Sequence, residues 1–117
     1  GTRNDIPDLL RAADIFAISS LSEAMGRAMI EATLLGRAVI APATGGIPEI
    51  IKEMETGLLF TPGNIDELAD RLDYLLTNRS EQIRLGENAR NANRQIFDAS
   101  TMVQQIEAVY SELLALN

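Results

Sequence analysis

The chain has 117 residues, a formal net charge of −7 and 46 % hydrophobic residues, which is typical of one domain with a hydrophobic core. It contains no cysteine and no histidine. Disulfides, thiol nucleophiles, Ser-His-Asp triads and Cys- or His-ligated metal sites are therefore excluded within it. Acidic residues outnumber basic ones in both halves of the chain, so no basic stripe predicts a nucleic-acid partner.

The two ends of the chain carry little targeting information. No apolar run approaches the roughly 18–20 residues that span a bilayer, and the polar start at 1–5 is unlike a signal peptide. We therefore expect a cytoplasmic location, with a longer parent protein free to sit peripherally at a membrane. The missing initiator methionine fits a piece of a longer chain, and a processed chain would look the same.

Short apolar runs alternate with helical segments over the first sixty residues. The runs 15–18, typical of a strand buried on both faces, and 38–41 predict two buried strands, and 57–60 predicts a third strand. The first expected helix is 5–13, with Asp5 as its cap and Pro7 near its start. A second helix is expected over 27–35 and is ended by Gly36. A third is expected over 47–52, with Pro48 in its first turn.

The second half of the sequence is helical. Helices are predicted over 65–77, over 80–96 with Ser80 as N-cap, and over 100–115. Apolar stripes run along 65–76 and 102–114, and each is interpreted as core or as a face for a partner domain. Because no strand separates the last two helices, we expect them to pack across the sheet or onto another domain.

This alternation predicts an α/β fold with about three short parallel strands, flanking helices and two extra C-terminal helices. Three strands make a narrow sheet, and the whole looks like half of a doubly wound, Rossmann-like domain. A sheet without its neighbouring strands leaves an unpaired edge, so we expect self-association.

The loop 20–26, between the first strand and the next helix, is the candidate site. Ligands of such sheets bind beyond the carboxyl ends of the strands, where helix N-termini favour phosphate. The amides of Met25, Gly26 and Arg27 are expected to face that crevice, flanked by Glu23 before them and Glu31 one turn into the helix. Amides suit phosphate and carboxylates suit vicinal hydroxyls, so the arrangement suits a nucleotide sugar.

Simpler interpretations of the same residues stay open. Two glutamates eight residues apart are most often solvated surface, and Arg27 with Glu31 fits a helix-surface ion pair. Gly45 and Gly46 are more typical of a turn than of phosphate binding. Glu49, Asp66 and Glu67 are interpreted as helix-start residues.

Seven spaced blocks, in order, resemble one family: 5–10, 12–16, 20–26 (SLSEAMG), 31–32, 36–41, 45–50 (GGIPEI) and 56–59. They are similar to the C-terminal part of the GT-B-fold, family-4 or group 1 retaining glycosyltransferases. The resemblance covers essentially all of 1–117, which it identifies as the C-terminal portion of a nucleotide-sugar-binding domain. It implies a transferase that moves a sugar from a nucleotide-diphosphate sugar to an acceptor.

The resemblance also implies roles for single residues. The family's E-x7-E motif falls on Glu23, which would contact hydroxyls of the transferred sugar as the catalytic residue, and on Glu31, which would bind the ribose hydroxyls. The amides of Met25, Gly26 and Arg27 would meet the donor sugar and diphosphate. The family uses no metal or other cofactor.

The chain departs from the family pattern at several points. Ala24 and Met25 stand where the family usually has glycine and an aromatic residue, Ser19 where it often has proline, and Met54 where it often has glycine. The acceptor-binding N-terminal domain and the Arg/Lys pair that neutralises the diphosphate are missing. We therefore expect the chain alone to be inactive.

Two other functions stay open from the sequence. One is a non-catalytic interaction module derived from the same fold, which would use its sheet edge or a helical face for a partner. The other is a flavodoxin-like or other doubly wound module that binds a different phosphate ligand.

Overall fold

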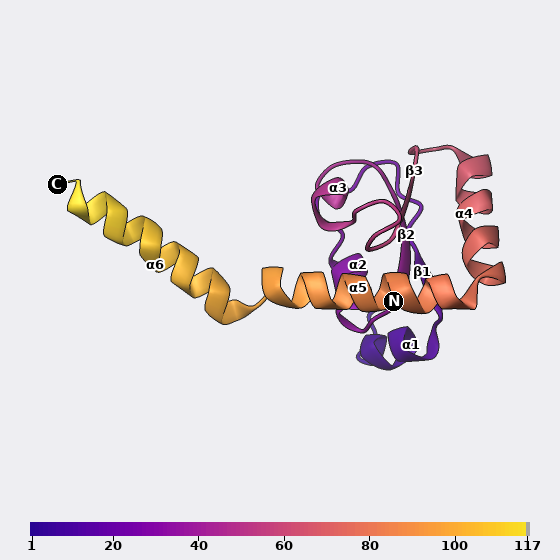
Figure 1. Ribbon diagram of the computed structural model, residues 1–117, viewed down its shortest axis with the longest axis horizontal. Coiled ribbons are helices and arrows are strands. Elements are labelled where there is room, and N and C mark those ends of the chain that lie inside the picture. Colours follow the sequence, from indigo (N-terminus) through magenta and orange to yellow (C-terminus); the bar gives the residue numbers. More distant parts are fainter. Residues whose placement is uncertain (117) are drawn as a thin grey trace.

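The computed structural model describes residues 1–116 and has an α/β fold (Figure 1). Three parallel strands lie in the order β1-β2-β3, with bounds Ile15–Ala17, Ala38–Pro42 and Leu58–Phe60. The helices among the described residues are α1 (Ile6–Ala12), α2 (Arg27–Leu34), α3 (Ile47–Ile50), α4 (Ile65–Thr77), α5 (Arg79–Ile96) and α6 (Ala99–Ala115). The predicted fold class is confirmed.

Each face of the sheet packs against its own helices. One hydrophobic cluster joins β2 to α1, α2 and α3 through Leu10, Met29, Ile30, Ala32, Val39, Ala41, Ile47 and Ile51. A second cluster, on the other face, joins β2 and β3 to α4 and α5 through Ala38, Ile40, Leu58, Phe60, Leu75 and Leu85. Because successive strand side chains alternate between faces, the fully buried β2 contributes to both clusters.

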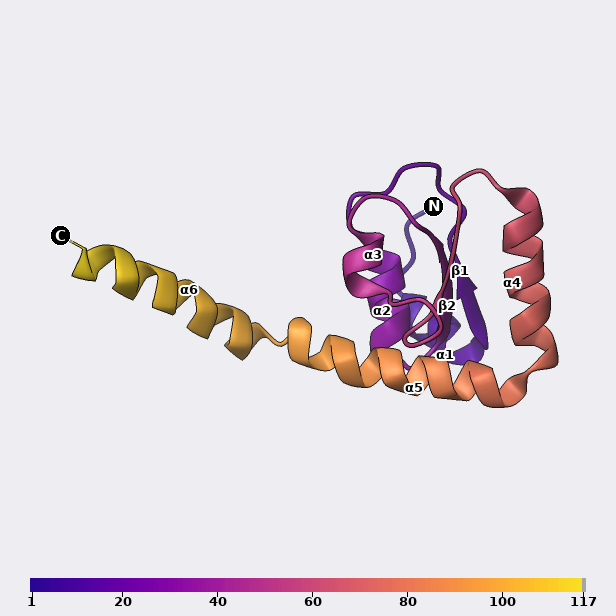
Figure 2. The same cartoon turned by 45° about the horizontal axis from the view of Figure 1, so that its top comes forward.

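Helix α5 crosses the amino edge of the sheet and contacts α2, α4 and β2 (Figure 2). Gly86 in its middle makes this crossing possible, since a Cβ there would lie 2.2 Å from the carbonyl oxygen of Gly36. The prediction that this helix packs across the sheet is confirmed.

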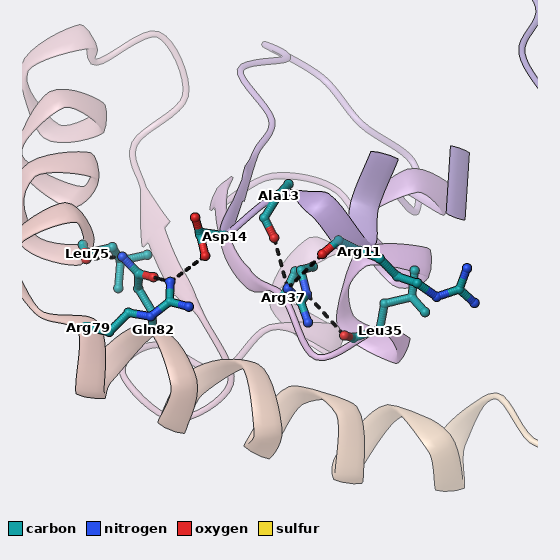
Figure 3. A network of polar contacts seen from close by, with 8 residues as sticks. All are labelled: Arg11, Ala13, Asp14, Leu35, Arg37, Leu75, Arg79 and Gln82. Atoms are coloured by element: carbon teal, nitrogen blue, oxygen red, sulfur yellow. Dashed lines mark hydrogen bonds and ion pairs between the residues drawn. The ribbon is translucent and has the colours of Figure 1, made fainter. Parts of the chain in front are cut away.

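Two sets of polar contacts lie at the same edge, and one of them fastens α5 to it (Figure 3). Arg79, the first residue of α5, pairs with Asp14, which precedes β1, and this contact holds the pKa of Asp14 below its usual value. Arg37, which precedes β2, donates to three carbonyl oxygens, those of Leu35 (3.1 Å), Ala13 (3.0 Å) and Arg11 (3.4 Å). The amino edge is thereby closed by the chain's own contacts.

Helix α6 extends away from the sheet and its helices, and the molecule is 58 Å long as a result (Figure 1). None of its residues is buried. Its apolar stripe is 48–74 % exposed at Met102, Val103, Ile106, Val109, Tyr110, Leu113 and Leu114. The interpretation of 102–114 as core is therefore wrong, and a face for a partner domain stays a prediction. In α4, by contrast, Leu75 is buried and Leu68 and Leu72 pack against the second cluster.

Several boundaries and environments differ from the prediction. Strand β1 is one of the two edge strands, and it is half-buried with Ala17 exposed. The N-cap position of α5 is Asn78, which also ends α4, so Ser80 lies inside the helix. The predicted helix over 47–52 ends at Ile50, and Asp5 occupies the N-cap position of α1 without a capping hydrogen bond.

Candidate functional site

Three loops gather at the carboxyl edge of the sheet: 18–26 after β1, 43–46 after β2 and 61–64 after β3. Figure 2 shows the loops after β1 and β3 on the side away from α5. In parallel sheets this edge is where ligands bind. The structure therefore places the predicted site residues at the edge that α5 leaves open.

Glu23 and Gly26 are joined within the 20–26 loop. The Gly26 amide donates a hydrogen bond to Glu23 Oε1 at 3.2 Å, and Glu23 is half-buried. Gly26 is buried in a left-handed conformation (φ +72°) at the N-cap position of α2, a conformation that glycine adopts without strain. Helix α2 has no side-chain cap, so its first amides are available to a ligand.

The other predicted site residues lie on the surface around this loop. The Met25 side chain is 49 % exposed, and Arg27 and Glu31 are exposed on the first two turns of α2. Among residues 1–116 the structure records no ion pair between Arg27 and Glu31. The simpler interpretation as a helix-surface ion pair is therefore not supported, and both charges remain available.

The glycine turn after β2 lies directly against the 20–26 loop. The Gly46 amide donates to the Ala24 carbonyl oxygen at 2.9 Å. Beside this contact an open pocket of about 490 Å³ is lined by Ala24, Met25, Gly46, Glu49, Ile50, Ile96 and Phe97. The sequence favours a turn over phosphate binding for the two glycines and does not predict this contact, whose signal is the adjacent Gly-Gly pair after a buried strand.

A smaller pocket of about 160 Å³ lies at the amino edge, lined in part by Asp14, Arg37, Arg79 and Arg90. Its polar groups are largely used by the Arg79–Asp14 pair and by the hydrogen bonds of Arg37. It lies at the opposite edge of the sheet from the predicted site residues. We therefore interpret this pocket as a structural contact between elements, separate from the candidate site.

The chemistry available at the carboxyl edge includes carboxylates, backbone amides, serine and threonine hydroxyls and the Arg27 guanidinium. Within residues 1–116 no group of three or more metal-ligating side chains is clustered. No helix in that part of the chain is long and apolar enough to cross a membrane. Such a site is suited to binding a phosphorylated sugar derivative through hydroxyls and phosphate oxygens.

Two of the departures from the family pattern differ in their backbone cost. Met54 has φ +60° and is the one non-glycine residue in a left-handed conformation among the described residues. Ala24 is not in that region, so the alanine in the 20–26 loop is accommodated without left-handed strain. The strain therefore lies at Met54, outside the loop.

Fold and site together define a class: an α/β domain whose candidate ligand site lies at the carboxyl ends of a parallel sheet. The chain belongs to the glycosyl transferases group 1 family, whose model matches residues 1–92. The predicted family and its GT-B fold are confirmed.

Curated relatives carry transferase and synthase names. The chain is 31 % identical over 114 residues to N-acetyl-alpha-D-glucosaminyl L-malate synthase of Bacillus anthracis, covering 97 % of the chain and 30 % of that protein. It is 36 % identical over 112 residues to D-inositol 3-phosphate glycosyltransferase of Corynebacterium glutamicum, covering 96 % of the chain and 27 % of that protein. The chain thus spans about three-tenths of the length of these relatives.

Solved structures give the same picture. Anabaena Alr3699/HepE in complex with UDP-glucose matches with a TM-score of 0.88 and 35 % identity, covering 96 % of the chain and 31 % of the other. A glycosyltransferase from Rickettsia africae matches with a TM-score of 0.88 and 31 % identity, covering 97 % and 31 %.

Proposed function

We propose that this chain is the C-terminal portion of a glycosyltransferase that binds a nucleotide-diphosphate sugar and transfers the sugar to an acceptor with retention of configuration. The observation that carries the proposal is the E-x7-E pair, Glu23 and Glu31, set around the uncapped N-terminus of α2 at the carboxyl edge of the sheet. The similarity to a structure solved with UDP-glucose supports it.

Each site residue has a role in this proposal. Glu23 is the catalytic residue that contacts hydroxyls of the transferred sugar, and Glu31 binds the ribose hydroxyls. The amides of Met25, Gly26 and Arg27 donate hydrogen bonds to the diphosphate oxygens, because amides at an uncapped helix N-terminus stabilise negative charge. The Gly26 amide exchanges its hydrogen bond to Glu23 Oε1 for one to a phosphate oxygen. No metal is required, since amides and cationic side chains carry the phosphate charge.

Most of the catalytic apparatus lies in other parts of the proposed protein. The chain spans about three-tenths of its relatives, and Arg27 is the one basic side chain named among its site residues. We propose that the acceptor-binding N-terminal domain is the partner of this chain. Catalysis then needs closure of both parts on the reactants, so residues 1–117 alone are inactive.

Two further features belong to this proposal. The location is cytoplasmic, with the acceptor domain deciding whether the protein lies peripherally at a membrane. The exposed stripe of α6 and the open edge of β1 also fit a second candidate, a non-catalytic interaction module of the same fold. Donor binding separates the two, because an interaction module has no need of it.

Calorimetric titration of UDP-, GDP- and ADP-sugars tests donor binding directly. We expect one of these nucleotide sugars to bind, weakly to the chain alone and more tightly to the whole protein. A chain and a whole protein that are both indifferent to all three would contradict the proposal. NMR of the transferred sugar's anomeric configuration in the product tests retention.

A further inference from the structure

Residues 20–26 are called the donor loop from here on. We propose that the Gly45–Gly46 turn positions the donor loop, and that Gly46 in particular fixes where the Glu23 carboxylate lies relative to the start of α2. The inference rests on the proposed donor-binding function. It concerns residues that touch no donor themselves and act through the backbone they support.

The turn and the donor loop are in backbone contact without any intervening side chain. The Gly46 amide donates to the Ala24 carbonyl oxygen at 2.9 Å. A Cβ on Gly46 would lie 2.6 Å from that same oxygen, and one on Gly45 would lie 1.8 Å from the carbonyl oxygen of Glu23. Neither contact is tolerated, so any side chain at 45 or 46 must push the donor loop outward.

The displaced segment is the one that holds the proposed donor contacts. Glu23 lies directly before Ala24, and its carboxylate accepts the hydrogen bond from the Gly26 amide. A shift of the carbonyl oxygens of residues 23 and 24 therefore moves the carboxylate and the start of α2 relative to each other. Displacements of about 1 Å in a binding site cost as much as a hundredfold in rate.

The two glycines are not equivalent as experimental targets. Gly45 has φ +56°, so alanine there adds left-handed strain to the clash. Gly46 has φ −81° and ψ −4°, a right-handed conformation that alanine adopts freely. Gly46→Ala therefore isolates the contact with the donor loop from any change in backbone preference.

Gly36→Ala is the matched control. Gly36 has φ +71° and lies at the amino edge, and its Cβ would meet no atom closer than 3.7 Å. This variant strains the backbone and lowers stability without touching the donor loop. Thermal unfolding of both variants measures how much of any effect is general loss of stability.

The decisive readout is donor affinity in the whole protein, titrated with UDP-, GDP- and ADP-glucose. We expect Gly46→Ala to weaken binding of the donor at least tenfold, and Gly36→Ala to leave it unchanged although its unfolding temperature falls. In turnover assays, Gly46→Ala should raise the KM for the donor and leave the KM for the acceptor at its wild-type value. Equal donor affinity of Gly46→Ala and wild type would overturn the inference.

Amide hydrogen exchange judges the inference without any donor. In the free wild-type protein the Gly46 and Gly26 amides should be protected, because each donates a hydrogen bond. In Gly46→Ala the Gly26 amide should exchange faster than in Gly36→Ala. An unprotected Gly46 amide in the wild type would overturn the inference even where Gly46→Ala fails to fold. A wild type that binds no donor but shows this protection would count against the proposed function alone.

Discussion

The proposed role of Glu31 can be tested directly by a single substitution. Glu31 carries a free carboxylate on α2, and hydrogen bonds to a charged group are worth about 1.5–3 kcal/mol. We expect Glu31→Ala to weaken nucleotide-sugar binding roughly tenfold to a hundredfold, as measured by calorimetry. Glu87→Ala is the control, since Glu87 is also exposed on a helix but lies at the amino edge. Equal losses in the two variants would contradict the role of Glu31.

Met54 is strained by its own backbone. Its φ of +60° costs an L-residue about 1–2 kcal/mol. Glycine at this position would relieve that strain, but part of the gain is offset because glycine has more conformational freedom in the unfolded chain. We expect Met54→Gly to raise the free energy of unfolding by about 0.5–1 kcal/mol in urea denaturation. Glu55→Gly, at the next position and without positive φ, should lower it. Destabilisation by Met54→Gly would show that the side chain contributes more than the strain costs.

At the scale of elements, the start of α4 links stability to pH. Glu67 accepts hydrogen bonds from the amide and hydroxyl of Thr61, and these bonds hold the pKa of its carboxyl below the usual value of 4.5. Because the folded pKa is depressed, this contribution is full above the unfolded pKa and is lost as pH falls through the folded pKa.

We therefore expect the unfolding free energy to fall as the pH drops below about 4.5. In Glu67→Gln this fall should be smaller, since the variant has no carboxyl to protonate. Urea unfolding of both proteins between pH 3 and pH 7, roughly the range in which a carboxyl group titrates, measures the difference between their pH profiles. Identical pH profiles for the two proteins would contradict the linkage.

The elements most accessible from sequence are those whose pattern is local. Helix α4 was predicted over its observed bounds because its apolar spacing and acidic first turn both belong to the helix itself. Buried strand β2 was equally clear from its continuous apolar run. Burial of β1 and α6 was not predictable in the same way, because it depends on neighbours that the apolar pattern does not identify. The stripe of α6 looks like core and lies on the surface.

The position of the candidate site residues in the fold was predictable from sequence, whereas the contacts that support them were not. The order of Glu23, Gly26 and Glu31 around a strand–loop–helix junction follows from sequence, because the junction is local. The hydrogen bond from Gly46 to Ala24 joins two loops that are separated in the chain. The parallel pairing of β1 and β2 brings these two loops together. No local sequence pattern predicts that Gly46 and Ala24 are in contact.

At the scale of the whole molecule, the described residues present the unpaired edge of β1 and the exposed stripe of α6. At β3, the other edge strand, the Leu59 amide donates to Glu53 Oε2. We expect the 117-residue chain to self-associate through the sheet edge, with an apparent mass above 12.7 kDa that rises with concentration in light scattering. A monomer at high concentration would contradict this expectation.

The edge can be tested separately from α6. The Ile18 amide donates to Ile40 within the sheet, so the alternation of the ladder turns the Ala17 amide toward the open edge. Ala17→Pro removes that donor without removing a bond to β2, and should reduce the apparent mass. If the mass falls only in Ile106→Lys, association runs through α6 instead.

Mapping amide chemical shifts during titration with UDP-, GDP- and ADP-glucose tests the central claim most directly, because it reports both binding and place. We predict that one of these donors shifts the amides of residues 23–27 and of Glu31, and leaves those around the amino-edge pocket, Asp14, Arg37, Arg79 and Arg90, unchanged. Shifts confined to that amino-edge pocket, or no shifts with any donor in either the chain or the whole protein, would contradict it.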